Sequence, residues 1–439
     1  MKVFVLDGDG VGLDFALRCQ MAGHDVKLWM APSKHQHVGE GIVTVVKGDW
    51  RRFMKWADLI YMTDDSKYYA ALQPYFDEGY PIWGTNPKAA ALETDRKFGM
   101  DVMKACGVEL PEWHEFSTYE EGSAFVREHG GRWACKPFND ADKSKAYLCK
   151  DAADMCYMFD KWAEEGNPKC KFLLQEFIPG MEFAVSGFYT PQTGWLGGVW
   201  CECFEHKKFM NGDVGCNTGE MGTVAKWVKD SQLAREMLEP LTSALATLNF
   251  CGHIDVNTIV DKNGQAWPLE FTARAGWPQS YLQYSMNQGD PCQFMKDALD
   301  GVDSLKVKSS VAVGVVLVLH PFPWTTDVDP AIHEGTPLYG VTEDNIEHIH
   351  LGSVKAGKAP HIFGENIKDK PCFVSAGPYL AIPVGLGHTV KAAQKKAYKL
   401  LDELSIPDSP LYRTDIGDKM EKWIPELQKH GYATEWAFD

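Results

Sequence analysis

The first thirty residues restrict the fold more than any other stretch of the chain. The apolar segment KVFVLD leads directly into a glycine-rich turn, GDGVG, at residues 8–12. The segment that follows, DFALRCQMAGHDVKLW, has the pattern of a helix, a turn and a second strand. A strand, a helix and a strand in this order begin a parallel α/β unit. The sequence therefore predicts a doubly wound N-terminal domain.

The glycine-rich turn does not carry a full nucleotide fingerprint. Gly8, Gly10 and Gly12 do not complete G-x-G-x-x-G, and no acidic residue closes the strand that ends near Trp29. A plain tight turn is therefore favoured over a dinucleotide site. Strand-like residues 58–63 and 81–84 continue the unit, and a helix over 89–106 is expected to lead into the next domain.

Length and charge limit the kind of protein this can be. A chain of 439 residues exceeds one compact core and indicates about two to four domains, which can enclose a cleft. A formal charge of -16 disfavours attraction to nucleic acid or anionic lipid. The longest apolar run, 311–319, is about half of the ~20 residues that span a bilayer, and the N-terminus lacks a signal-peptide pattern. A cytoplasmic protein with reduced cysteines is expected.

The middle of the chain reads as strands that carry charged residues near their ends. Residues 132–148 predict a strand, a polar loop and a strand, and a helix follows over 152–165. Two apolar strands within 171–190 flank a Pro-Gly turn and predict a hairpin. A second hairpin over 252–276, turned at Asn263 and Gly264, brings Asp255 and Glu270 to adjacent strands. Later strands are expected in 311–319 and 373–383, with a helix around 390–404.

These residues match the needs of a nucleoside triphosphate. Lys136 ends a strand where its ammonium can reach phosphate oxygens, although a solvated lysine is the alternative. Gln175 can read an adenine edge and Glu182 can accept hydrogen bonds from a ribose, unless the hairpin is an ordinary one with exposed acids. Asp255 and Glu270 lie among apolar residues, where acids usually have a metal or cation partner, and a pair of surface acids is the alternative.

The stretch EHKKFMNGDVGCNTGEMG, residues 205–222, is rich in glycine, amides and positive charge. By composition alone it is a surface loop, with glycines for turns and lysines for solubility. Its place between the two hairpins favours another interpretation, in which His206, Lys207 and Lys208 supply positive charge and residues 215–219 donate to an anionic substrate.

In their order, these motifs resemble a known family. Lys136, QEFIPGMEF, HKKFMNGDVGCNTGEMG, PLEFTARAG, GLGHTVKAAQKKAY and YRTDIG resemble the glycinamide ribonucleotide synthetases (phosphoribosylamine-glycine ligases) of the ATP-grasp superfamily. The resemblance implies an α/β and α+β multidomain protein with an N-terminal Rossmann-like domain (1–92), an ATP-grasp domain (93–308, with a lid at 112–185) and a closing domain (309–439). It also implies that ATP phosphorylates a carboxylate and that an amine attacks the acyl phosphate. By the resemblance the carboxylate is that of glycine and the amine is 5-phosphoribosylamine, which gives glycinamide ribonucleotide, ADP and phosphate, a reaction of purine biosynthesis.

The resemblance assigns roles to individual residues. Those expected to bind ATP are Arg96, Lys97, Lys136, Gln175, Glu176, Ile178, Glu182 and Lys208. Those expected to act in catalysis are Lys136, Lys207 and Arg274, the last by orienting the carboxylate or acyl phosphate. Asp213, Asn217, Thr218, Gly219 and Arg274 are expected to contact the substrates. Glu270, Asp255 and Thr272 are expected around Mg²⁺ or Mn²⁺. The expected partners are a small amino acid and an amine, with no nucleic acid or membrane; oligomeric state stays open.

Departures from the family pattern concentrate on the substrate side. Thr272 stands where the family has asparagine, and FNDADKSK replaces its glycine-rich lid. The motif R-x-G-D-P-E becomes RAGWPQ at 274–279, and Glu220 replaces a glycine. The N-terminal Arg-Glu-His and a later Gly-Pro-Glu loop, near Asp64, are also missing. Two alternatives therefore stay open: a ligase that joins a different amino acid to a different amine, and an inactive nucleotide-binding homologue.

Overall fold

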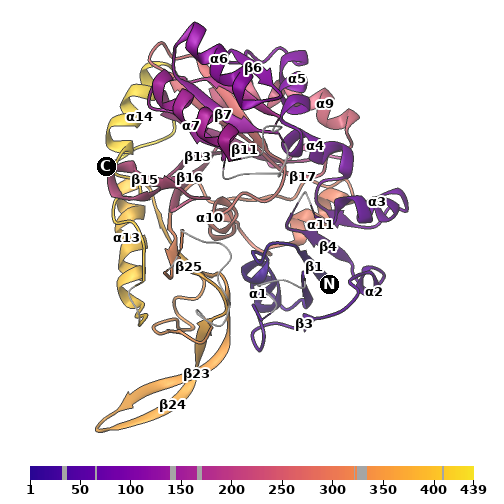
Figure 1. Cartoon of the computed structure of the whole chain (residues 1–439). Helices are drawn as coiled ribbons and strands as arrows, with labels where there is room; N and C mark the ends of the chain where they lie inside the picture. Colours follow the sequence, from indigo (N-terminus) through magenta and orange to yellow (C-terminus); the bar gives the residue numbers. More distant parts are fainter. Residues whose placement is uncertain are drawn as a thin grey trace.

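The computed structural model describes residues 1–31, 37–64, 67–138, 145–165, 171–320, 322–323, 334–407 and 410–439. Within these ranges the chain forms an N-terminal parallel sheet, a small antiparallel unit and a large antiparallel sheet (Figure 1). None of the helices described in these ranges is long and apolar enough to cross a bilayer.

The N-terminal sheet has five parallel strands in the order β3-β2-β1-β4-β5. Its elements are β1 (Lys2–Asp7), α1 (Leu13–Met21), β2 (Asp25–Met30), β3 (Val45–Val46), α2 (Arg51–Met54), β4 (Leu59–Met62), α3 (Tyr69–Asp77) and β5 (Ile82–Trp83). The doubly wound prediction is confirmed. Because the chain leaves β1 toward β2 and later returns on the other side as β4, the carboxyl ends of β1 and β4 form the switch point where such sheets bind ligands.

Two helices, not one, follow this sheet. The expected helix over 89–106 is divided into α4 (Pro87–Thr94) and α5 (Arg96–Ala105). Asp95 between them is extended, and its carboxylate accepts a hydrogen bond from the backbone N–H of Phe98. An aspartate in this position caps a new helix, so the break places Arg96 at a helix start.

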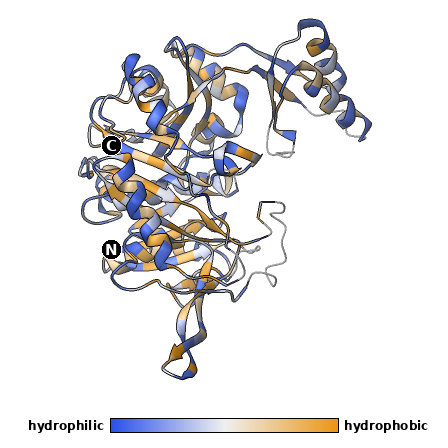
Figure 2. Cartoon of the chain, turned by 90° about the vertical axis from the view of Figure 1, so that its left-hand side faces the viewer, coloured by the Kyte–Doolittle hydropathy of each residue, from blue (hydrophilic) through white to orange (hydrophobic). Residues whose placement is uncertain are grey.

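A small unit then stands apart from the main body, at the top right of Figure 2. Its sheet has the order β6-β9-β7-β8, formed by β6 (Trp113–Phe116), β7 (Trp133–Pro137), β8 (Tyr147–Leu148) and β9 (Phe172–Glu176). Helices α6 (Tyr119–His129) and α7 (Ala152–Glu164) pack with it around a separate aromatic core that includes Phe159, Trp162 and Phe172. Most of the expected lid loop, 139–144, lies outside the described residues.

The prediction of a hairpin within 171–190 is wrong. Strand β9 pairs with β6 and β7, whereas β10 (Gly180–Glu182) pairs with β17 in the large sheet. Residues 177–179 therefore connect two sheets. An apolar pattern identifies strands, but it does not identify the sheet edge with which each strand pairs.

The large sheet has eleven strands, with a main path β10-β17-β11-β13-β16-β19-β25-β20 and with β12, β18 and β22 at its sides. Their bounds are β11 (Ala184–Thr190), β12 (Gly194–Trp195), β13 (Trp200–Glu205), β16 (Gly222–Val228), β17 (Gly252–Asp261), β18 (Ala266–Thr272), β19 (Val311–Val315), β20 (Leu317–Val318), β22 (Ile349–Leu351) and β25 (Tyr379–Gly387). The β17–β18 hairpin confirms the prediction for that segment. The expected boundary at 308 falls within one continuous sheet, because β16 pairs with β19.

The remaining elements surround this sheet. The helices are α8 (Gln232–Met237), α9 (Thr242–Thr247), α10 (Gln279–Met286), α11 (Gln293–Leu299), α13 (Val390–Glu403) and α14 (Met420–Lys429), with short 3-10 turns at Asn211–Asp213 and Glu239–Leu241. The remaining strands are β14 (Lys208–Met210), β15 (Val214–Asn217), β21 (Pro337–Leu338), β23 (Val354–Phe363) and β24 (Asn366–Ser375). The β23–β24 hairpin projects away from the body at the bottom of Figure 1.

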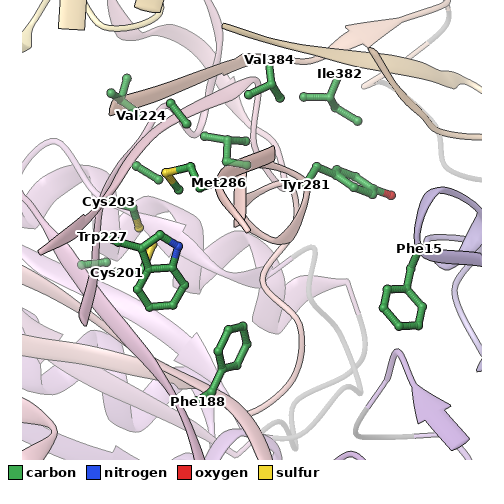
Figure 3. Packing of buried hydrophobic residues seen from close by; sticks show 14 of the residues in the cluster. Phe15, Phe188, Cys201, Cys203, Val224, Trp227, Tyr281, Met286, Ile382 and Val384 are labelled. Carbon is green, nitrogen blue, oxygen red and sulfur yellow. The ribbon is translucent and has the colours of Figure 1, made fainter. Parts of the chain in front are cut away.

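One hydrophobic core joins the N-terminal sheet to the large sheet. Figure 3 shows Phe15 of α1, Tyr281 of α10 and Val384 of β25 among its buried members. A polar chain runs through the same region: His350 Nδ1 lies 2.7 Å from Asp14 Oδ2, and its Nε2 lies 2.7 Å from Ser285 Oγ. All three residues are buried. This chain connects α1, β22 and α10 and fixes the parts of the molecule relative to one another.

Candidate active site

The β17–β18 hairpin supplies the acidic centre of the site. Its register pairs Asp255 with Thr272 and Asn257 with Glu270. Side chains of paired residues point to the same face of a sheet, and side chains two residues apart share that face. The fold therefore brings together three of the expected metal-site residues and adds Asn257, which the sequence interpretation missed.

Three cations from distant parts of the chain surround Glu270. Arg96 at the start of α5 donates to Glu270 Oε2 over 3.1 Å, and Lys207 Nζ lies 3.9 Å from Glu270 Oε1. Lys136, on β7 of the small unit, donates to the carbonyl of Leu269 over 3.0 Å. Burial opposes ionisation of Glu270, but Lys207, Arg96 and Lys136 together lower its pKa to about 2. This carboxylate is therefore ionised at neutral pH.

The cations are themselves perturbed. Burial lowers the pKa of Lys136 to about 8, against the effect of Glu270. Lys207 behaves in the opposite way, because the carboxylates of Glu205 and Glu270 outweigh burial and raise its pKa well above the usual value. Its Nζ lies 3.0 Å from Glu205 Oε2. Positive charge is thus gathered beside acids that lie on strands, as phosphate and metal binding require.

Two further acids of the site are buried. Asp255 is 2% exposed, and neither of its carboxylate oxygens has a hydrogen-bond partner in the part of the chain that the structure describes. Burial, reinforced by Glu205, raises the pKa of Asp255 well above the ordinary value. Glu220 is also buried, contacts Thr223, and has its pKa raised by burial and by Glu205.

Such a donor set fits a divalent cation. Orphaned buried oxygens and an excess of carboxylates are costly unless a cation or a proton compensates them. These acids do not form a compact ligand set by themselves. Among the described residues, His24, Asp290 and Cys292, which are not part of this site, are the one group that brings three ligand atoms within 4.8 Å of one another. Asp255, Glu270 and the Asn257 amide are the residues that would hold the ion, with the half-buried Thr272 beside them.

The expected nucleotide contacts divide into two groups. Gln175 is buried on β9, and Ile178 is half-buried on the connection to β10. Glu182, at the end of β10, is half-buried and close enough to raise the pKa of Lys207. Glu176 is exposed at the end of β9. Lys97 lies apart from this group, because its Nζ contacts Asp101 and Glu115 on an exposed face.

The stretch 205–222 does not carry positive charge at every position where the sequence suggested it. Burial, together with the charges of Lys419 and Arg413, lowers the pKa of His206 well below its usual value, so this side chain is neutral and does not add positive charge. Its Nε2 instead accepts a hydrogen bond from the backbone N–H of Gly417 over 3.1 Å. The expectation of a charged His206 is therefore wrong, because the sequence did not show that this residue is enclosed.

The C-terminal motif YRTDIG closes the same stretch. Arg413 is buried and donates to Asp213 over 2.7 Å and to the carbonyl of Lys208 over 2.9 Å. Lys419 donates to the carbonyl of Glu205 over 2.7 Å. Asp213 is thus committed to an ion pair within the protein. Arg413 and Lys419 were missed as site residues, although Arg413 lies in a motif that the family resemblance had singled out.

Of the remaining expected substrate residues, Asn217, Thr218 and Gly219 belong to this stretch and Arg274 lies outside it. The backbone N–H and the hydroxyl of Thr218 both donate to the carbonyl of Lys207 over 2.8 Å, which holds the lysine in place. Asn217 and Gly219 are exposed, and Gly219 lies near the ring of Trp277. Arg274 lies 3.3 Å from Glu93 and donates to the carbonyl of Ala275 over 3.2 Å.

A narrow pocket adjoins Arg274. It lies between the carboxyl ends of β4 and β5, the start of β17, and α10. Its lining residues are Tyr61, Met62, Asp64, Trp83, Gly84, Thr85, Phe188, Cys251, Gly252, His253, Arg274, Ala275, Ser280, Gln283, Tyr284 and Met295. The pocket thus lies at the carboxyl ends of β4 and β5, next to the acidic hairpin.

Comparison with known proteins agrees with this geometry. Residues 94–280 match the family model described as phosphoribosylglycinamide synthetase, ATP-grasp (A) domain. The phosphoribosylamine-glycine ligase of Ralstonia nicotianae is 25% identical over 358 residues, which cover 78% of this chain and 79% of that protein. The phosphoribosylamine-glycine ligase of Salmonella typhimurium is 26% identical over 354 residues, covering 77% and 78%.

Solved structures show the same fold. A phosphoribosylamine-glycine ligase from Thermotoga maritima superposes with a TM-score of 0.70 at 17% identity, covering 95% of this chain and 100% of that one. An N5-carboxyaminoimidazole synthetase from Staphylococcus aureus complexed with ADP gives a TM-score of 0.57 at 13% identity, covering 91% and 97%. The chain therefore has the ATP-grasp fold, as expected.

Within that class the chain is similar to the phosphoribosylamine-glycine ligases, and residues 94–280 match the ATP-grasp domain model of that family. The resemblance drawn from the motifs is thus confirmed, and the names of the relatives agree with the expected ligase activity. The individual site residues and the domain limits stay predictions.

Proposed function

We propose that this protein is an ATP-dependent ligase that joins a carboxylate to an amine through an acyl phosphate. Its proposed substrates are glycine and 5-phosphoribosylamine, and its products are glycinamide ribonucleotide, ADP and phosphate. The observation that carries the proposal is the meeting of Arg96, Lys136 and Lys207 around Glu270, opposite Asn257. These residues come from four separate segments. An ordinary structural ion pair would not need three cations for one carboxylate.

In the proposed reaction, the carboxylate substrate attacks the γ-phosphorus of ATP, an acyl phosphate forms, and ADP leaves. The amine nitrogen then bonds to the acyl carbon, the bond from that carbon to the phosphate oxygen breaks, and phosphate leaves with the electron pair. The nitrogen releases its proton to solvent or to a nearby carboxylate. Lys136, Lys207 and Arg96 would hold phosphate oxygens, while Arg274 would orient the acyl group.

A divalent metal, Mg²⁺ or Mn²⁺, would supply charge neutralisation between the phosphates. Glu270 and Asp255 would hold it, with the oxygens of Asn257 and Thr272 nearby. Neutralisation by the ion would also relieve the unpartnered oxygens of Asp255. We also propose that the protein is cytoplasmic, as a ligase of small-molecule substrates would be.

The test is ADP release by the purified protein with MgATP. It is measured across a panel of amino acids, each with and without amines that include the phosphoribosylamine of the relatives' names. Release that requires both an amino acid and an amine supports the proposal. Binding of ATP without release for any pair would instead support the alternative of an inactive homologue.

A matched pair of variants makes the test residue-specific. Glu270→Gln keeps the side-chain size but removes the charge that holds Arg96, so we expect ADP release to fall by more than about 100-fold. Glu365→Gln, at the exposed end of the β23–β24 hairpin, is the control and should leave the rate unchanged. Equal rates for Glu270→Gln and wild type would remove Glu270 from the site.

A further inference from the structure

A second group of metal-ligating side chains lies where the turn between α1 and β2 meets the segment between α10 and α11. His24 Nε2 lies 2.7 Å from Asp290 Oδ2, and Cys292 Sγ lies 3.5 Å from Asp290 Oδ1. The ligand atoms of these three residues all lie within 4.8 Å of one another. None of the three belongs to the acidic β17–β18 hairpin, so the group is distinct from the candidate active site.

Local turns fix the position of each ligand. Helix α1 is followed by a turn at Gly23, whose φ is 88°, and this turn brings His24 in front of β2. Asp290 Oδ1 accepts hydrogen bonds from the backbone N–H groups of Cys292 (3.0 Å) and Gln293 (2.9 Å). These bonds orient the carboxylate and leave its other oxygen directed at His24. Hydrogen bonds of this kind hold the ligands of metal sites in place.

The imidazole presents one of its two nitrogens to the group. His24 Nδ1 lies 3.1 Å from the amino nitrogen of Met1, so Nε2 is the ring atom that faces Asp290. The contact made by one ring nitrogen decides which nitrogen binds a metal. The side chain of His24 is 9% exposed and that of Asp290 is 30% exposed. An ion from solvent can therefore reach the three ligand atoms from the Asp290 side.

Sulfur gives this group a metal preference that differs from that of the acidic hairpin. Cys292 is fully buried, and a second buried thiol, that of Cys19 on α1, has its pKa raised by burial and by its neighbours Cys292 and Asp290. Mg²⁺ takes oxygen ligands, whereas a thiolate combined with an imidazole and a carboxylate is typical of Zn²⁺.

The separations between the ligand atoms also fit zinc. Tetrahedral Zn²⁺ binds nitrogen, oxygen and sulfur at about 2.0–2.3 Å, which places the ligand atoms about 3–4 Å from one another. The separations between His24, Asp290 and Cys292 therefore need to change by about 1 Å or less to surround an ion.

We propose that His24, Asp290 and Cys292 bind a Zn²⁺ ion in a structural site that is separate from the site of ATP-dependent ligation. The ion would replace the hydrogen bond between His24 and Asp290, and the Cys292 thiol would release its proton to solvent and bind as the thiolate. His24 and Asp290 are 266 residues apart in the sequence, so the ion would connect the N-terminal sheet with the segment before α11. The site does not depend on the proposed ligase reaction.

The first test is Zn²⁺ binding by the full-length protein after a chelator has removed bound metal. The titration is done in excess Mg²⁺, which occupies the carboxylate site for MgATP, and in competition with a chromophoric zinc chelator. We expect about one Zn²⁺ ion per chain, bound with a Kd below about 1 μM. Weaker binding, or no binding, overturns the proposal.

Co²⁺ in place of Zn²⁺ shows which atoms bind the ion. A thiolate ligand gives Co²⁺ a sulfur-to-metal charge-transfer band in the near ultraviolet, which oxygen ligands do not give. We expect this band in wild type and in Cys106→Ser, which removes a half-buried thiol just after α5, and its loss in Cys292→Ser. An unchanged band in Cys292→Ser overturns the proposal. So does the absence of the band from wild type, a result that needs no variant to fold.

Variants of the other two ligands complete the assignment. His24→Gln and Asp290→Asn each keep a hydrogen-bonding side chain but remove one ligand, so we expect the Kd for Zn²⁺ to rise at least tenfold. His129→Gln, at an exposed helix end, is the control and should keep the wild-type Kd. Zn²⁺ should also raise the melting temperature of wild type more than that of either ligand variant. Equal Kd values for wild type and both ligand variants would mean that zinc binds elsewhere, and would overturn the proposal.

Discussion

The chain Asp14–His350–Ser285 gives a quantitative prediction for stability against pH. His350 is fully buried; burial and the nearby Arg18 lower its pKa from 6.5 to about 4, although Asp14 acts in the opposite direction. A neutral imidazole fits the geometry, in which one ring nitrogen donates to Asp14 and the other accepts from Ser285. At pH values between about 4 and 6.5, His350 therefore stays unprotonated in the folded protein but is protonated in the unfolded chain.

The sign follows from proton binding. Between pH 6.5 and 4 the unfolded chain binds a proton at His350 and the folded protein does not, so acid favours unfolding. For pKa values of 6.5 and about 4, the free energy of unfolding falls by about 2 kcal/mol between pH 7 and pH 5. The share of the free energy of unfolding that depends on a neutral His350 is fully present above pH 6.5 and decreases as the pH falls.

The assay is urea unfolding at pH 7 and pH 5, followed by tryptophan fluorescence and circular dichroism. His350→Gln keeps a side chain that can donate and accept hydrogen bonds but does not titrate, so its loss of stability between the two pH values should be smaller than that of wild type by about 2 kcal/mol. His129→Gln, at an exposed helix end, is the control and should behave as wild type. The same loss in His350→Gln and wild type would refute the reasoning.

Two further predictions concern the acidic hairpin and its cations. Burial raises the pKa of Asp255, so Asp255→Asn should raise the melting temperature in the absence of metal. The same variant should weaken Mg²⁺ binding, measured by calorimetry, by about 10- to 100-fold. A lower melting temperature with unchanged Mg²⁺ binding would contradict this. Lys136→Met removes a cation from the phosphate side and should reduce kcat/KM for ATP by about 10- to 100-fold, with no change in kcat/KM for the amine. An unchanged kcat/KM for ATP in the ADP-release assay would exclude a contact between Lys136 and ATP.

Much of the fold could be read from local patterns. The β1-turn-α1-β2 start, the β17–β18 hairpin with its Asn-Gly turn, and helix α13 all follow from periodicity and turn residues within short windows. The motif order was also sufficient to find the similarity to the phosphoribosylamine-glycine ligases, because these residues must keep their spacing for chemical reasons.

Pairing between distant strands could not be read in this way. The apolar segments on either side of Pro179 look like one hairpin, yet they belong to different sheets. Hydrogen bonding between strands depends on which edges are free after the rest of the chain has folded, and local sequence does not contain that information.

The sequence by itself determined which residue types are available and which stretches form strands and helices. Only the tertiary structure decided their charge states and partners. Burial made His206 neutral, and Arg413 committed Asp213 to an ion pair. The return of β4 beside β1 added the hydroxyl of Thr63 to the three backbone N–H groups of residues 9, 10 and 12 that donate to the buried Asp7. The physical reason is that desolvation and Coulomb energy depend on distance and enclosure in space, which residues far apart in the sequence create together.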